Sequence, residues 1–142
     1  MQQDTPIAID LNADVGEHTT ARQIATESAI MRIVTSVNIA CGGHAGDIDS
    51  MRAAVRAAAA NDVAVGAHPS FPDRAQFGRV PMALDPEELR ASLREQLATL
   101  RDVARSEGVS LLHCKPHGAL YHAASYDNAI AEAVHRACAD VA

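Results

Sequence analysis

Short apolar segments alternate with longer segments of helical periodicity along the whole chain, and this alternation constrains the fold more than any other feature. The apolar segments are rich in β-branched residues, which is typical of strands. Strands that are each followed by a helix predict an α/β fold, in which right-handed crossovers connect the strands of a parallel sheet. The predicted strands span residues 7–12, 37–40, 63–67 and 110–115.

Helices are predicted between these strands because apolar residues recur there at spacings of three and four. The helix after the second strand starts beside an aspartate that can cap it, and an Asp-Pro pair starts the next helix, which ends at a glycine. The predicted helices span 20–35, 47–61, 85–108 and a last segment that starts at Ser125 or Asp127.

Composition narrows the class of partners without indicating a reaction. The 142 residues suffice for one domain, and the scarcity of aromatic residues favours a layered α/β core of Ala, Val, Ile and Leu. A net charge of −6 without a Lys/Arg cluster argues against nucleic acid or an anionic membrane as partner. No apolar run reaches the roughly 20 residues of a membrane span, and the first residues lack the layout of a signal peptide. Three widely spaced cysteines favour reduced thiols and a cytoplasmic location.

Polar residues that carry chemistry gather where one predicted strand after another ends. In a parallel βα array, ligands bind beyond the carboxyl ends of the strands, so these residues form the candidate site. The long connection at 70–84 adds two arginines that suit a carboxylate or a phosphate. The candidates are Asp10, Asn12, Asp14, Asn38, His44, Asp47, His68, Arg74, Arg79, Lys115 and His117.

Several of these residues also have purely structural explanations. Asp47 can equally cap a helix, His68 can hydrogen-bond within its loop, and the arginines can be solvated loop charges. His113 alternates with the apolar side of its strand, which favours a packed or surface role. Lys115 and His117 share a face, and a lysine at a buried strand end needs an anionic partner or ligand.

Histidines and carboxylates in one pocket support two kinds of chemistry. Two histidines and a carboxylate with an open position can hold a divalent metal and activate water; Asp10, His44 and His68 are the candidate ligands. Without metal, the same groups can act as general acid and base on an amide or lactam. Lys115 can stabilise an oxyanion or a transferring phosphoryl group. No serine or cysteine lies in a nucleophile-elbow pattern, which argues against an acyl-enzyme.

Four motifs at these strand ends carry a resemblance to a known family. They are IDLNADVGE at 9–17, NIACGGHAGD at 38–47, VGAHPSFPDRAQFGR at 65–79 and KPHGALY at 115–121. In this order and spacing they resemble the LamB/YcsF family over essentially the whole chain. The resemblance implies a parallel (β/α) barrel of the glycoside hydrolase/deacetylase type in a cytoplasmic bacterial protein. It also implies the A component of 5-oxoprolinase, which uses ATP to open 5-oxoproline (pyroglutamate) to L-glutamate together with two other subunits, B and C.

The resemblance also assigns roles to residues at the matching motif positions. It points to Asp10, Asp14, His44 and His68 as catalytic or metal-proximal, with Asp47, Lys115 and His117 completing the pocket and Arg74 and Arg79 near the substrate or phosphate. From the chemistry of these side chains we predict that Asp10, Asp14, His44, His68, Lys115 and His117 are catalytic, and that Asn12, Asn38, Asp47, Arg74 and Arg79 bind substrate. In the related deacetylase-type barrels, Asp and His at strand ends hold a metal, so the resemblance implies a divalent metal as well as ATP.

The chain departs from the family pattern in two respects. Gly43 stands where the family has an aromatic residue, so one wall of the pocket is expected to be more open. Only about four βα units are present, roughly half a barrel, and the last parallel strand is expected to have an unpaired edge. We therefore expect residues 1–142 to form a single domain, the N-terminal part of a longer barrel. The alternative is that a partner or a second copy covers the edge, the latter giving a homo-oligomer.

Two alternative functions remain compatible with the sequence. The first is a stand-alone metal-dependent amidohydrolase or deacetylase, which ATP dependence would exclude. The second is a non-catalytic half-barrel module that docks through its open edge. Loss of activity on mutating the edge, but none on His44→Ala or His68→Ala, would support this second alternative.

Overall fold

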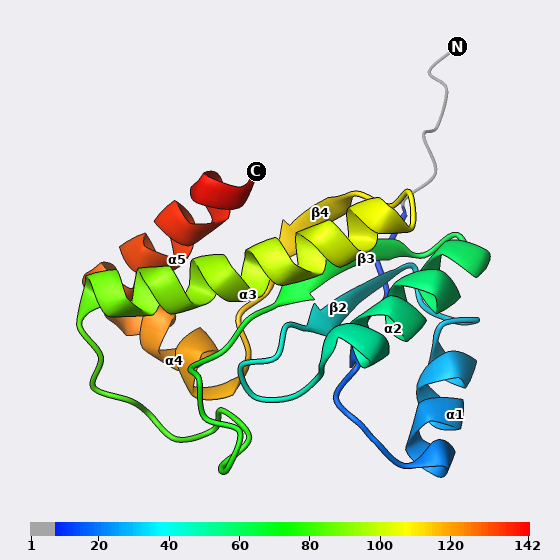
Figure 1. Cartoon of the computed structure of the whole chain (residues 1–142), viewed down its shortest axis with the longest axis horizontal. Helices are drawn as coiled ribbons and strands as arrows, with labels where there is room; N and C mark the ends of the chain where they lie inside the picture. Colours follow the sequence, from blue (N-terminus) through cyan, green and yellow to red (C-terminus); the bar gives the residue numbers. More distant parts are fainter. Residues whose placement is uncertain (1–7) are drawn as a thin grey trace.

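The computed structural model describes residues 8–142, which contain a four-stranded sheet of order β1-β2-β3-β4 (Figure 1). All neighbouring strands are parallel, so the predicted α/β class and parallel sheet are confirmed. The strands are β1 (Asn12–Val15), β2 (Ser36–Ala40), β3 (Ala64–His68) and β4 (Leu111–Cys114). The helices are α1 (Ala21–Ile30), α2 (Ile48–Ala60), α3 (Pro86–Ser106), α4 (Gly118–Tyr126) and α5 (Asn128–Val141).

Three elements differ from the sequence-based expectation. β1 begins at Asn12 rather than at residue 7, which itself lies outside the described residues. The first helix ends at Ile30, five residues before the predicted end, and a turn leads from it into β2. Helix α4 was not predicted, because it starts at His117–Gly118 without a side-chain cap to mark its beginning.

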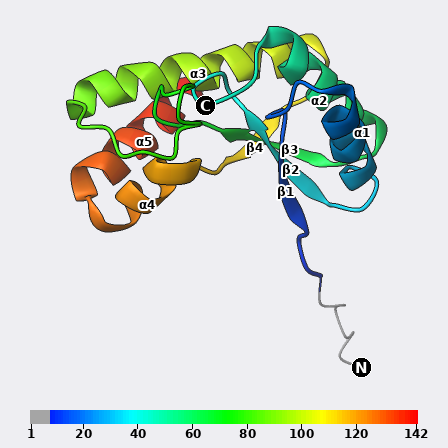
Figure 2. The ribbon, with the colours of Figure 1, turned by 90° about the horizontal axis from the view of Figure 1, so that it is seen from below.

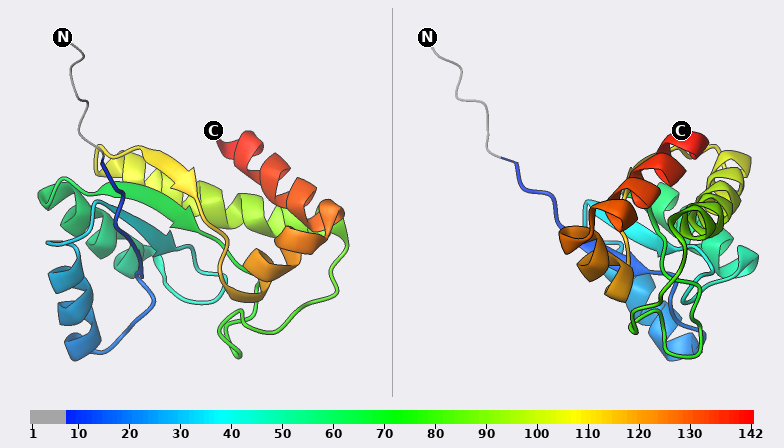
Figure 3. Two further views of the ribbon diagram at one scale, coloured as in Figure 1. Left: turned by 180° about the vertical axis from the view of Figure 1, so that it is seen from behind. Right: turned by 90° about the vertical axis from the view of Figure 1, so that its left-hand side faces the viewer.

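The hydrophobic core lies between the sheet and the helices on one of its faces. Val37 and Ile39 on β2 and Val65 on β3 point into it, since alternate residues of a strand face the same side. The facing stripe of α3 is made by leucines at spacings of four and three, all of them buried: Leu89, Leu93, Leu97 and Leu100. Figure 3 (left) shows the sheet in front of α2 and α3. No helix of the described residues is long and apolar enough to cross a bilayer.

Strand β4 forms an open edge of the sheet in the described part of the chain. Beside it lies a groove of about 330 Å³ whose lining includes Leu97 of α3, Leu111 of β4 and Val141 of α5. Leu112 on the same strand is 71% exposed. β2, β3 and β4 point toward the side of the molecule where α4 lies (Figures 1 and 2), and β1 runs parallel to β2, so the loops after the strands share one rim.

Candidate metal and catalytic site

A ladder of polar side chains covers the face of the sheet opposite the core. Asn38, fully buried on β2, donates to Asp14 Oδ1 at 2.7 Å and to Asn12 Oδ1, both on β1. Asn38 Oδ1 lies 2.7 Å from His113 Nε2 on β4, two strands away. Gly66 on the intervening strand permits this reach, because a Cβ there would overlap the His113 ring. The ladder therefore links three strands through side-chain hydrogen bonds.

His113 is a member of this ladder that the sequence pattern did not identify. Apolar alternation along its strand favoured a packed or surface role. An irregularity in the pairing between Val65 and Gly66 shifts the register of β4 and turns the half-buried His113 ring onto the polar face. A bulge of this kind depends on the neighbouring strand and leaves no mark in the local sequence.

The carboxylate of Asp14 joins the ladder to the ends of β3 and β4. Lys115 Nζ lies 2.8 and 2.9 Å from its two oxygens, and His68 Nε2 lies 3.4 Å from Oδ2. Burial by itself raises the pKa of Asp14, but hydrogen bonds from His68, Lys115 and Asn38 outweigh burial and hold that pKa well below the usual range. Asp14 is therefore ionised at neutral pH and paired with an ammonium group.

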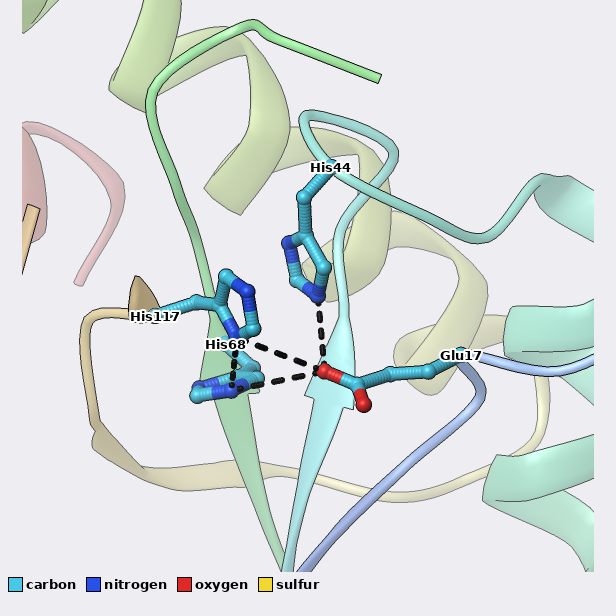
Figure 4. Close-up of side chains that lie close together, drawn as sticks. All are labelled: Glu17, His44, His68 and His117. Atoms are coloured by element: carbon cyan, nitrogen blue, oxygen red, sulfur yellow. Dashed lines mark hydrogen bonds and ion pairs between the residues drawn. The ribbon is translucent and has the colours of Figure 1, made fainter. Parts of the chain in front are cut away.

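Four side chains from the ends of the four strands converge, as Figure 4 shows, and His68 places the group beside Asp14. They are Glu17, His44, His68 and His117, and their ligand atoms all lie within 4.8 Å of one another. The three histidines are buried, and the rings of His44 and His117 stack with centroids 3.6 Å apart. Glu17 Oε1 is 2.8 Å from His44 Nε2. The same oxygen is 3.4 and 3.7 Å from the inward nitrogens of the other two rings.

Backbone carbonyls determine which ring nitrogen carries hydrogen in two of these histidines. His68 Nδ1 lies 2.6 Å from the carbonyl oxygen of Lys115, and His117 Nε2 lies 2.9 Å from that of Phe77. A carbonyl oxygen can only accept, so both of these nitrogens donate. In neutral rings the inward nitrogens, His68 Nε2 and His117 Nδ1, then face each other at 3.0 Å as two acceptors. Two lone pairs at this distance require a proton or a metal ion between them.

The donor set fits a divalent metal ion. Three imidazole nitrogens and one carboxylate oxygen are ligands that Zn²⁺ and similar ions prefer. Hydrogen bonds from the outer ring nitrogens to carbonyls are the usual support of histidine ligands. His44 Nδ1 is buried without a hydrogen-bond partner among the described residues, so Glu17 is the contact that orients this ring. These residues can therefore hold a metal.

Burial and neighbouring groups shift the pKa of two cluster members toward the forms that metal binding needs. Burial raises the pKa of Glu17, but the hydrogen bond from His44 and the positive charge that the histidines carry when protonated outweigh it, and the pKa is lowered. Burial, followed by the charge of His44, lowers the pKa of His117. Glu17 is thus a carboxylate and His117 a neutral imidazole at pH 7.

Asp10 does not reach this cluster, which corrects the prediction that it is catalytic or holds a metal with two histidines. It precedes β1, and its carboxylate accepts hydrogen bonds from Thr35 and Ser36. These residues lie at the amino end of β2, whereas His68 ends β3 at the opposite end of the sheet. Asp10 lies away from the cluster because β1 starts at Asn12, after Asp10. The predicted strand, residues 7–12, would have placed Asp10 near its carboxyl end.

Glu17 is the cluster member that the sequence pattern did not identify. It ends the first motif directly after Gly16, whose φ of +76° turns the chain at the end of β1. An acidic residue immediately after a strand-ending glycine was the available signal. The predicted strand ends at residue 12, too early for Glu17 to count among the residues at its end.

The two loop arginines lie around the cluster rather than in it. Arg74 Nη1 donates to two backbone carbonyls of the loop that carries His44, at 2.8 and 2.9 Å, and so fixes that loop. The guanidinium of Arg79 lies 5.3 Å from the centroid of the Phe77 ring. Phe77 packs edge-on against His44. Both arginines therefore contact residues that flank the candidate site.

Asp47, predicted to bind substrate, acts as a helix cap in the structure. Its side chain accepts from the Ser50 N–H at 2.8 Å, and the Ser50 hydroxyl accepts from the Asp47 N–H, which completes a capping box. Hydrogen bonding by Ser50 lowers the pKa of Asp47. The stabilisation is therefore fully present above the unfolded pKa, about 4, and is lost as pH falls through the lower folded pKa.

Replacing Asp47 with alanine is expected to lower the free energy of unfolding by about 1 kcal/mol at pH 7. The difference should shrink below about pH 4, where the Asp47 carboxylate of the unfolded chain takes up a proton and that of the folded protein has not yet done so. Asp47→Ser is the matched control, because a serine cap stabilises the helix without this titration. Urea denaturation of wild type, Asp47→Ala and Asp47→Ser at pH 3 and pH 7 measures the effect. An equal Asp47→Ala deficit at pH 3 and pH 7 would contradict it.

Gly43 permits a close approach of the Gln96 and Ser70 side chains. A Cβ at this position would lie closer than 3.0 Å to the Gln96 side chain and to the Ser70 hydroxyl. Gln96 is buried and holds Ser70 from both sides, accepting from its N–H at 3.0 Å and donating to its carbonyl at 2.9 Å. Gln96 fills part of the space beside Gly43, and a hollow of about 470 Å³ whose lining includes Gly43 and Gln96 remains there.

Gly43→Ala is expected to lower the free energy of unfolding by about 1–3 kcal/mol, because the added methyl group displaces Gln96 from Ser70. The same substitution should have a clearly smaller effect in a Gln96→Ala background, where the clash is absent. Denaturant unfolding of the two single variants and the double variant measures the coupling. Additive effects would show that the two positions are independent.

The arrangement defines a class of protein, a partial parallel (β/α) barrel with a candidate metal site at its strand ends. More particularly, the chain belongs to the LamB/YcsF family, which it matches over residues 9–142. This confirms the family resemblance of the sequence motifs.

Individual relatives agree with this assignment. The A component of the 5-oxoprolinase of Methylococcus capsulatus is 52% identical over 126 residues, covering 89% of this chain and 48% of that protein. The A component of the Chloroflexus aggregans enzyme is 50% identical over 133 residues, covering 94% and 53%. The crystal structure of a lactam utilization protein from Thermus thermophilus is 45% identical with a TM-score of 0.88, covering 93% of this chain and 53% of that one. The chain thus spans about half the length of these relatives.

Proposed function

We propose that this chain forms the N-terminal part of the A component of a 5-oxoprolinase, which opens 5-oxoproline to L-glutamate. In this proposal the reaction is coupled to ATP hydrolysis and takes place in the cytoplasm, in a complex with two other subunits. The observation that carries the proposal is the contact of Asp14 with both Lys115 and the buried cluster of Glu17 and three histidines. The names of two relatives at about half identity support the choice of reaction.

The lactam is proposed to bind between the polar ladder and the cluster. Opening the ring requires water to add to the lactam carbonyl carbon and the ring nitrogen to leave as an amine. The ammonium of Lys115 is suited to stabilise negative charge on the lactam oxygen, or on a phosphoryl group transferred to it from ATP. Asp14 is ionised and 34% exposed at its side chain, so it can accept a hydrogen bond from the attacking water and orient it.

A divalent metal is the second cofactor of the proposal. The residues that would hold it are Glu17, His44, His68 and His117. When bound, such an ion supplies Lewis-acid polarisation and lowers the pKa of water. The chain's own contribution is to keep the ring nitrogens oriented through the carbonyls of Lys115 and Phe77.

The test is glutamate release from 5-oxoproline by the A component that contains this chain, with and without ATP and the two partner subunits. We expect release only when ATP and both partners are present, and we expect loss of release in Asp14→Asn. Release that does not need ATP would overturn the proposal. No release under any condition, together with unchanged partner binding by His44→Ala, would favour the non-catalytic module.

A stand-alone metal-dependent amidohydrolase or deacetylase is the second candidate, and the three-histidine cluster is the observation that favours it. Under this candidate, a chelator abolishes hydrolysis of simple amides or acetylated sugars, and neither ATP nor partners change the rate. The assay above therefore separates the two functions through its dependence on ATP.

A further inference from the structure

The only buried residue of helix α1, all of which the structure describes, is a carboxylate, Glu27, which the proposed reaction does not use. The side chain is 12% exposed. Burying a carboxylate is unfavourable unless hydrogen bonds replace the lost water. The contacts of Glu27 therefore indicate why it occupies the inner side of this helix.

The side-chain contacts of Glu27 go to three consecutive residues of the turn after β1. Its Oε2 accepts from the Gly16 N–H at 3.1 Å, and its Oε1 accepts from the Glu17 N–H at 3.3 Å. Oε1 also lies 2.8 Å from His18 Nδ1. On the other side, Gly16 packs against β2, where a Cβ would meet Ile39 at 3.4 Å. The turn is therefore held from both sides, by β2 and by the Glu27 carboxylate.

We propose that Glu27 is a positioning residue that fixes the backbone of Glu17, so that the Glu17 carboxylate reaches the three histidines. Glu17 Oε1 lies 2.8 Å from His44 Nε2, and its distance from the buried rings depends on where its backbone stands. Gly16 at positive φ has wide conformational freedom when its N–H has no acceptor. Glu27 removes that freedom. The inference rests on the proposed function only in one respect: it takes the cluster of Glu17 and the three histidines as the active site.

Glu27→Gln is the decisive variant, because it keeps the size of the side chain but replaces one accepting oxygen with a donor. We expect Zn²⁺ or Co²⁺ to bind about 10–100-fold more weakly, as happens when groups supporting metal ligands are removed. Glu88→Gln, an exposed glutamate in the first turn of α3, is the matched control and should bind like wild type. In a Glu17→Gln background, Glu27→Gln should change metal affinity little further, because its effect is transmitted through Glu17.

Three results would overturn the inference. One is wild-type metal affinity in a folded Glu27→Gln protein, and another is an undiminished effect of this substitution in the Glu17→Gln background. The third needs no metal: a crystal structure of metal-free Glu27→Gln in which Glu17 still contacts His44. If this variant fails to fold, the same three measurements are made on Glu27→Asp. Aspartate keeps both carboxylate oxygens but is one methylene shorter, so they lie farther from the Gly16 and Glu17 N–H groups. Absence of metal binding in the wild-type protein would refute the metal in the proposed function, and the crystal structure would still decide the role of Glu27.

Discussion

His68→Ala is expected to abolish divalent-metal binding and to lower glutamate release by about 10³-fold. His68 is 1% exposed, and its Nε2 lies within 3.0–3.7 Å of groups on His117, Asp14 and Glu17. This one nitrogen therefore faces two members of the cluster and the carboxylate beside it. Equilibrium dialysis with Zn²⁺ measures the first effect, and glutamate release in the presence of ATP and partner subunits measures the second.

The control for this experiment is His135→Ala, which removes an exposed histidine of α5. It should retain both metal binding and activity. Circular dichroism and thermal unfolding of both variants show whether the sheet still forms. A folded His68→Ala protein that binds one metal with wild-type affinity would rule out His68 as a ligand.

Lys115→Met is expected to lower the rate of glutamate release by about 10²–10³-fold while leaving metal binding nearly intact. Methionine keeps much of the length of the side chain and removes the charge that faces both Asp14 oxygens. Because the two groups work as a pair, Asp14→Asn combined with Lys115→Met should be little worse than the more damaging single variant. The rates of the single and double variants at saturating 5-oxoproline and ATP measure this.

Contact between Lys115 and the substrate can also be tested in the wild-type protein, because Lys115 is its only lysine. Reductive methylation with ¹³C-formaldehyde therefore labels a single side chain, apart from the N-terminal amine. The carbon signal of that side chain should move when 5-oxoproline binds. A signal that does not respond to saturating substrate would contradict contact between Lys115 and the ligand.

The parts of the fold that depend on local pattern were predictable from the sequence. Helix α3 shows an Asp85-Pro86 start and a regular leucine stripe, and its bounds agree with the prediction to within two residues. The start of β1 was not predictable, because pairing with β2 rather than β-propensity sets it. Asn12 pairs with Ser36, the first residue of β2, and the preceding Leu11 carbonyl accepts from both Thr35 and Ser36.

The candidate site shows the same division between local and distant information. His44, His68 and His117 were predicted because each follows a recognisable strand, and Lys115 was predicted from its place at a buried strand end. Glu17 depends on a turn whose geometry is held by Glu27, ten residues away and on another element. Contacts of this kind exist only in the folded chain, so the pattern of apolar residues does not reveal them.

One face of the sheet packs the apolar core and the other carries the polar ladder, and this difference affects which substitutions the fold tolerates. Folding free energy comes mainly from the apolar side, where Ile39, Val65 and the α3 leucines pack. The proposed recognition and chemistry depend on the polar side, where Asn38 contacts both Asp14 and His113. Asn38 is fully buried, so its replacement would leave hydrogen-bonding groups without partners. Exposed positions on this face can change without disturbing the apolar packing, whereas the buried ladder cannot.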